Sequence, residues 1–242
     1  MLALRGELGS SFRLLGELGY EAAELMVRDG SELRAGEIAR MAGDCGLAIP
    51  AVSTGQMRKE DGLQLCSPNG ELRRRSIDRT KQLLDFAAEL GAQVNIGTLR
   101  GTLPDRDRGV ESLVELLEHS RGIAVEPQCR WVTNWIHTTA EAKELIRECE
   151  GLSILFDFYH AELEETSVAA ALVGAEELIS WVQVSDSNRR APGWGHWDFA
   201  EYERMLVAVG YWGYVSVECL PLPSAEAAAR QAMRWLRAVS CE

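Results

Sequence analysis

The feature that most constrains this chain is a regular alternation of short apolar runs with amphipathic helical stretches. Seven apolar runs of four to eight residues or so predict strands, and each follows a stretch with helical periodicity. Strands that alternate with helices imply a parallel sheet, because each helix carries the chain back to the starting edge. The strands are expected at 21–27, 48–54, 92–98, 122–126, 152–157, 180–185 and 214–218, and the helices at 9–18, 34–45, 69–90, 107–119, 138–149, 163–174, 198–209 and 224–238.

The chain is expected to form one domain over residues 1–242. It has no composition break, linker or low-complexity segment, and 242 residues can bury a substantial core. No run of 18 or more apolar residues predicts a membrane span, and the N-terminal residues lack the pattern of a signal peptide. We therefore expect a cytoplasmic protein with no membrane partner.

Charge and cysteine usage narrow the class of function. The formal charge of −12 argues against a nucleic-acid partner, because binding a polyanion requires a basic surface. The six cysteines are scattered and contain no Cys-x-x-Cys pair. Neither a zinc knuckle nor a thioredoxin-type redox pair is therefore indicated.

Four polar residues lie at or near the ends of four consecutive predicted strands: Glu126, Asp157, Gln183 and Glu218. A doubly wound open sheet would spread these ends along a line, roughly 5 Å per strand. In a parallel barrel the same ends converge on one mouth, where the active sites of barrel enzymes lie. No Gly-x-Gly-x-x-Gly or Walker-type loop follows any predicted strand, which also disfavours the open sheet. We therefore predict a (β/α)-barrel.

The four residues supply hard oxygen ligands, which suit Mg²⁺, Mn²⁺ or Co²⁺. Any one of these carboxylates alone would more simply be a surface group or a helix cap, but four at matched strand ends favour a metal site. His160, three residues after Asp157, lies just beyond a strand end, so a functional role competes with simple packing. Arg189 could hold a substrate oxygen or could form a salt bridge.

At these residues the sequence resembles the xylose-isomerase-like family of TIM-barrel sugar isomerases and epimerases. Its motifs include Asp157-Phe-Tyr-His160, and the stretch 184–223 is the most specific. The resemblance is closest to the branch that contains 5-keto-L-gluconate epimerase and the ketose 3-epimerases. The matching segments are 19–29, 53–56, 61–63, 125–127, 133–138, 157–160, 184–199 and 210–223.

The resemblance implies a role for each matching position. Glu126, Asp157, Gln183 and Glu218 fall on the metal positions, and Glu126 and Glu218 also on the catalytic acid/base pair. His160 and Arg189 fall on substrate-binding positions. The implied activity is a divalent-metal-dependent epimerase or isomerase of a small keto-sugar or keto-sugar acid, which transfers a proton through a metal-stabilised enediolate.

The sequence departs from the family pattern in three places. No strand precedes the helix at 9–18, so we expect a (β/α)8-type TIM barrel that lacks the usual first strand, with a neighbouring subunit of a homo-oligomer or the N-terminal residues over the gap. Gln183 replaces a common histidine. Val132 and Cys129 stand where acidic and asparagine residues are usual, which bears on the choice of sugar.

Three other functions compete with this interpretation. A dehydratase, similar to 3-dehydroshikimate dehydratase, could use the same site to expel a hydroxyl group. A catalytically degraded barrel would explain the absent strand. A DNA-repair endonuclease of the related barrel type is disfavoured, because it needs a histidine-rich site and a basic groove, whereas this chain has four histidines and a charge of −12.

Overall fold

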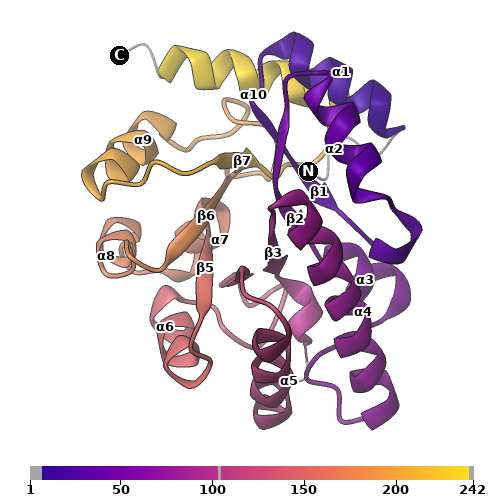
Figure 1. The fold of residues 1–242 in the computed structure, drawn as a ribbon. Helices are drawn as coiled ribbons and strands as arrows, with labels where there is room; N and C mark the ends of the chain where they lie inside the picture. Colours follow the sequence, from indigo (N-terminus) through magenta and orange to yellow (C-terminus); the bar gives the residue numbers. More distant parts are fainter. Residues whose placement is uncertain (1–6, 103–104, 240–242) are drawn as a thin grey trace.

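Seven parallel strands form the centre of the molecule, with helices around them (Figure 1). The computed structural model describes residues 7–102 and 105–239. Each strand is hydrogen-bonded to the next one along the chain, and this sequential order is that of a TIM barrel. The predicted fold is confirmed. The strands are β1 (Ala22–Met26), β2 (Ala48–Ser53), β3 (Gln93–Ile96), β4 (Ile123–Val125), β5 (Leu152–Asp157), β6 (Ile179–Val184) and β7 (Val215–Val217).

The helices begin and end at residues with clear local signals. Asn69 caps the longest helix at its start, and Gly91, at φ 67°, ends it. Thr138 and Glu141 form a reciprocal capping box. No described helix is both long and apolar enough to cross a membrane. The helices are α1 (Leu8–Leu18), α2 (Ala35–Gly43), α3 (Gly55–Asp61), α4 (Gly70–Leu90), α5 (Arg106–His119), α6 (Thr139–Glu148), α7 (Phe158–Glu164), α8 (Val168–Val173), α9 (Phe199–Ala208) and α10 (Ala225–Val239), with 3-10 turns at η1 (Gly30–Glu32) and η2 (Thr98–Arg100).

One predicted helix was wrong in its extent. The helix expected at 163–174 is two helices, α7 and α8, with a break between them. Asp157 ends β5 and also caps α7, since its carboxylate accepts a hydrogen bond from the Tyr159 N–H. Ser167 starts α8 in the same way, by accepting from Ala170 N–H. α7 therefore starts directly at the end of β5, and His160 lies on the first turn of α7.

The strands separate two apolar regions. The large one lies between the strands and the surrounding helices. The small one fills the inside of the barrel with Ala51, Ala124, Leu155 and Trp181. Two of its four members are alanines, so the indole of Trp181 and nearby polar side chains occupy the remaining interior space.

The barrel has one open seam, between β1 and β7. In the described part of the chain these strands pair only on their other edges, with β2 and β6. A cavity of about 1080 Å³ lies along the seam and is lined by apolar side chains of α1, β1 and β7, among them Phe12, Leu25 and Val217. α1 and α10 pack against each other beside it (Figure 1). Within residues 7–102 and 105–239 the barrel has seven strands, one fewer than eight, as predicted.

Candidate active site

Four polar side chains lie at the carboxyl ends of four neighbouring strands. Glu126 follows β4 directly, Asp157 ends β5, and Glu218 follows β7 directly. Gln183, next to last in β6, is the register partner of Asp157. Glu126, Gln183 and Glu218 line one cavity of about 380 Å³ at this end of the barrel, which we call the mouth. The structure thus brings the four residues to the same end of the barrel, and their roles as metal ligands and catalytic groups stay predictions.

Glu126 is positioned by Gln128 of its own loop, next to the backbone that follows β3. Gln128 donates a hydrogen bond from Nε2 to Glu126 Oε2 at 2.8 Å. Gly97, just after β3, lets this pair approach closely, because a Cβ at that position would collide with both side chains. The position therefore requires glycine for space.

Two of the four predicted ligands carry a buried oxygen with no hydrogen-bond partner among the described residues. These atoms are Glu126 Oε1 and Gln183 Oε1, and Gln128 Oε1 shares the property. Buried polar atoms are normally hydrogen-bonded, and leaving one without a partner costs about 1–3 kcal/mol. Oxygens of this kind are ready to bind a ligand that supplies positive charge or a hydrogen-bond donor.

Arg189 forms salt bridges with two of the predicted metal ligands. Its Nη1 lies 2.7 Å from Asp157 Oδ2, and its Nη2 donates to Glu218 Oε2. The guanidinium also stacks on the ring of Tyr159, 4.5 Å from its centre. The backbone at Arg189 has φ 58°, in the left-handed region that non-glycine residues rarely adopt. In this structure Arg189 therefore forms a salt bridge with both carboxylates, and its role in substrate binding stays a prediction.

The ring of His160 lies among the carboxylates. Its Nδ1 accepts a hydrogen bond from the Cys129 N–H at 3.2 Å. In a neutral ring the proton is then on Nε2, which lies 3.5 Å from Glu126 Oε1 and 3.7 Å from Asp157 Oδ2. Burial lowers the pKa of His160 to about 4, so the ring is neutral at pH 7.

His160 also belongs to a possible metal cluster that differs from the predicted set. In the described part of the chain, ligand atoms of Glu126, Asp157 and His160 lie within 4.8 Å of one another. The sequence-based ligand set contained no histidine. The bond from Cys129 favours a protonated Nε2, which donates to an oxygen and does not bind a metal ion.

The mouth attracts positive charge. Burial raises the pKa of Glu126 well above its usual value, and the carboxylates of Glu218 and Asp157 raise it further. Burial also raises the pKa of Glu218, although Arg189 opposes this effect. The guanidinium of Arg189 supplies one positive charge to three closely spaced buried carboxylates, so the cluster would also take up a proton or a metal ion.

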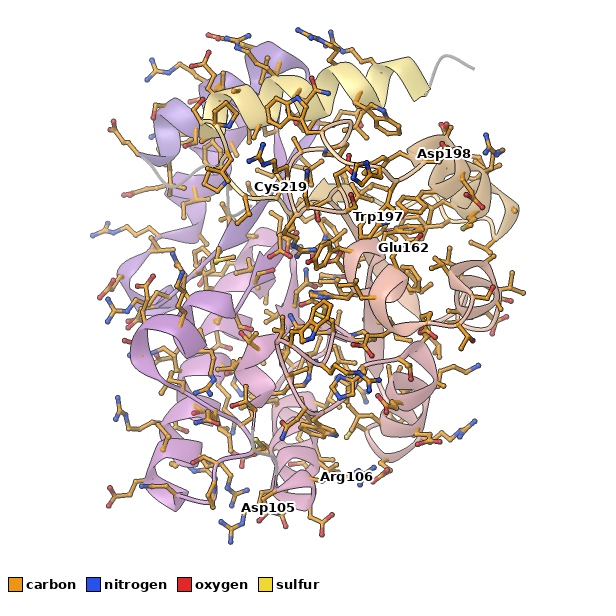
Figure 2. The ribbon with its side chains drawn as sticks, turned by 180° about the vertical axis from the view of Figure 1, so that it is seen from behind. Asp105, Arg106, Glu162, Trp197, Asp198 and Cys219 are labelled. Atoms are coloured by element: carbon orange, nitrogen blue, oxygen red, sulfur yellow. The ribbon has the colours of Figure 1, made fainter. Side chains whose placement is uncertain are left out.

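A shaped loop follows β6 and carries Arg189. Asp186 is buried, and its carboxylate accepts hydrogen bonds from the N–H groups of Ser187, Gly193 and Trp197. It organises the loop backbone and is not one of the cavity-lining acids. The loop returns Trp197, labelled in Figure 2, to within 5.6 Å of the Tyr159 ring, measured between ring centres. This contact packs the loop against the ring on which the Arg189 guanidinium stacks.

Two functional candidates escaped the sequence analysis. Gln128, two residues after Glu126, could have been found as a further polar residue beyond a strand end. Glu24 is a charged residue inside an otherwise apolar strand, and its side chain is buried in the barrel, where it contacts Gln183. Charge in a predicted strand was a visible signal, because buried carboxylates are rare unless they serve a purpose.

Comparison with models of protein families shows to which family the chain belongs. The family model described as "Xylose isomerase-like TIM barrel" matches residues 12–239. The chain belongs to this family. The family predicted from the sequence motifs is therefore confirmed.

The chain is also similar to individual proteins, at lower levels of identity. The chain is 34% identical over 118 residues to a 3-dehydro-D-guloside 4-epimerase of Escherichia coli, a match that covers 48% of this chain and 45% of that protein. It is 25% identical over 217 residues to an L-ribulose 3-epimerase of Mesorhizobium japonicum, and this match covers 84% of this chain and 72% of that protein. Among solved structures, an L-ribulose 3-epimerase superimposes with a TM-score of 0.83 at 21% identity, covering 98% of this chain and 90% of that one. At this identity the superposition establishes the fold alone.

Proposed function

We propose that this chain is a divalent-metal-dependent epimerase or isomerase of a small keto-sugar or keto-sugar acid. The observation that carries the proposal is the mouth itself, which Glu126, Gln183 and Glu218 line and beside which Asp157 lies, and where Glu126 and Gln183 each carry a buried oxygen with no hydrogen-bond partner among the described residues. The names of the relatives support the class, since both are sugar epimerases and epimerases are isomerases.

The residues present fit a divalent cation. Glu126, Asp157, Gln183 and Glu218 would hold it, because all four offer hard oxygen atoms, and Glu126 Oε1 and Gln183 Oε1 accept no hydrogen bond from any residue that the structure describes. Mn²⁺, Mg²⁺ and Co²⁺ suit such a set. When bound, the cation would stabilise the negative charge that develops on the carbonyl and hydroxyl oxygens of the substrate.

The proton transfer falls to Glu218 and Glu126. They follow β7 and β4, with β5 and β6 between them, so they enter the cavity from different sides. One carboxylate removes the proton from the carbon beside the carbonyl group, and the other returns a proton to the opposite face of the planar enediolate. The carbon centre is thereby inverted. Return of the proton to the neighbouring carbon gives an isomerisation in the same site.

Arg189 and His160 would bind the substrate. Both present N–H groups toward the carboxylates at the mouth, and a sugar hydroxyl or a carboxylate group could accept from them. The neutral state of His160 suits this role, since a neutral ring adds no charge repulsion toward Arg189. Polar sugars thus fit the mouth better than apolar substrates.

Solvent isotope exchange tests the proposal. The purified protein, loaded with Mn²⁺, is incubated in D₂O with a panel of ketohexoses, ketopentoses and keto-sugar acids, and the products are read by NMR. We expect deuterium at one carbon beside the carbonyl of a substrate, together with its epimer. Loss of water without an epimer would indicate a dehydratase, and no exchange with any member would overturn the proposed chemistry. A mass measurement on the same sample checks the expected homo-oligomer.

A further inference from the structure

Glu24 lies inside the barrel and gathers hydrogen bonds from four strands. Its strand, β1, borders the seam, and the residue is 9% exposed. The donors are hydroxyl, amide and indole groups that converge on its two carboxylate oxygens. They are Ser53 Oγ, Asn95 Nδ2 at 3.0 Å, Trp181 Nε1 at 3.1 Å, Gln183 Nε2 at 3.0 Å from each oxygen, and Ser216 Oγ at 2.7 Å.

The bond to Gln183 decides which end of its amide group faces the cavity. Gln183 Nε2 is committed to Glu24, while Gln183 Oε1 is buried, has no partner among the described residues, and belongs to a side chain that lines the mouth. Turning the amide over would set Oε1 against two carboxylate oxygens, which repel it. Glu24 therefore removes the ambiguity of a glutamine side chain, which can offer either a donor or an acceptor.

We propose that Glu24 is a positioning residue that fixes Gln183 as an oxygen donor toward a divalent cation. The inference rests on the proposed function, because it concerns the cation of that same site. It assigns a purpose to a buried carboxylate outside the mouth, and it makes all four metal positions oxygen ligands. Such a set favours Mn²⁺ and Mg²⁺ over cations that prefer nitrogen or sulfur. Partners that orient a ligand typically change metal affinity about 10–100-fold when removed.

A purely structural role is the rival explanation. Glu24 also connects β1 to Ser216 of β7 across the seam, so its loss could simply loosen the barrel. Ser216→Ala is a matched control, because it removes one hydrogen bond to Glu24 and leaves the bond between Glu24 and Gln183 in place. A structural role would lower the melting temperature of both variants and would leave their affinity for the cation unchanged.

The test measures Mn²⁺ affinity by calorimetry and by the electron paramagnetic resonance signal of free Mn²⁺, with the melting temperature of the full chain beside it. We expect Glu24→Gln to weaken Mn²⁺ binding about 10-fold or more, because the new amide can donate to Gln183 Oε1 and turn it away. Ser216→Ala should change the affinity by less than about 2-fold, since it leaves the ligand orientation alone.

A second variant keeps the test sharp if Glu24→Gln folds poorly. In the double variant Glu24→Gln, Gln183→Glu the hydrogen bond is re-formed with donor and acceptor exchanged, and one carboxylate oxygen stays available at the mouth. We expect it to recover Mn²⁺ affinity to within about 3-fold of the wild type. The single variant Gln183→Glu sets the new carboxylate against that of Glu24. It should therefore lose stability, and its Mn²⁺ affinity should not reach that of the double variant.

The outcomes separate this inference from the proposed function. Equal Mn²⁺ affinity in the wild type and in Glu24→Gln, or no recovery in a folded double variant, would overturn the positioning role while the proposed activity stands. A wild type that binds no Mn²⁺ would overturn both.

Discussion

The mouth and the seam hold buried carboxylates in opposite ways. At the mouth, Glu126 keeps an oxygen without a hydrogen-bond donor among the described residues, and Asp157 and Glu218 share the single guanidinium of Arg189. At the seam, Glu24 receives hydrogen bonds on both oxygens from hydroxyl, amide and indole groups. The carboxylates at the mouth therefore have too few partners for their charge, whereas both oxygens of Glu24 at the seam are fully hydrogen-bonded.

The difference shows which carboxylates are available for chemistry. A saturated carboxylate such as Glu24 has no lone pair left for a substrate, and its value is in the groups it orients. An incomplete cluster costs stability, and proteins keep such clusters where a ligand completes them. The four predictions below test this contrast, from the largest expected effect to the smallest.

Glu218→Gln should have the largest effect, on activity. The amide keeps the size of the side chain and can still pair weakly with Arg189, but it cannot accept the proton of the substrate. Loss of a general base typically lowers the rate about 10²–10⁴-fold. Epimer formation followed by NMR measures it, with circular dichroism showing that the fold persists. Glu89→Gln, an exposed change in α4, is the matched control and should keep full activity.

Arg189→Ala should have the next largest effect, on stability without metal. It leaves Asp157 buried beside Glu218 with no cation between them, and breaking a buried ion pair typically costs about 3–5 kcal/mol. Added Mn²⁺ should then raise the melting temperature more than in the wild type, because the metal no longer competes with the guanidinium. Arg190→Ala, exposed in the same loop, is the control. If both variants respond to EDTA and Mn²⁺ alike, Arg189 does not balance the charge of the mouth.

The sequence was sufficient for the fold and for the four strand-end residues, because both depend on periodicity and on the position of a residue along its strand. The two salt bridges of Arg189 could not be predicted from the sequence. They depend on a loop residue at φ 58° whose conformation is set by backbone contacts to Asp186, and no local pattern signals that geometry. Glu24 was visible as a charge in a strand, but its partners come from β2, β3, β6 and β7. Only the closed arrangement of strands brings them together.

His160 should give the mouth a pH-dependent stability. Its pKa is lowered by burial to about 4 in the folded protein, below about 6.5 in the unfolded chain. As the pH falls below 6.5, the unfolded state takes up a proton first, so the fold loses stability until the pH reaches about 4. The full span corresponds to about 3 kcal/mol.

The variant His160→Gln isolates this contribution. Denaturant unfolding between pH 7 and pH 4, in EDTA, should show the wild type losing more stability than His160→Gln. Glu126 and Glu218 have raised pKa values and act in the opposite direction, since they favour the fold as the pH falls, but both proteins contain them. Parallel curves for the two proteins would contradict the assignment.

Two serines give the smallest and most direct comparison of the regions. Ser216 donates to Glu24 at the seam, and Ser185 accepts from Arg189 Nη1 at 3.1 Å near the mouth. Each makes a hydrogen bond to a charged group, so replacement by alanine should cost about 1.5 kcal/mol of unfolding free energy in either place. The effects on activity should differ. Ser216→Ala should keep the wild-type rate of epimerisation, because Glu24 retains its other donors. Ser185→Ala frees Arg189 to shift, so its loss of activity, expressed as a free energy, should exceed its loss of unfolding free energy. Equal losses of activity in the two variants would mean that seam and mouth act as one region, and the contrast drawn between them would not hold.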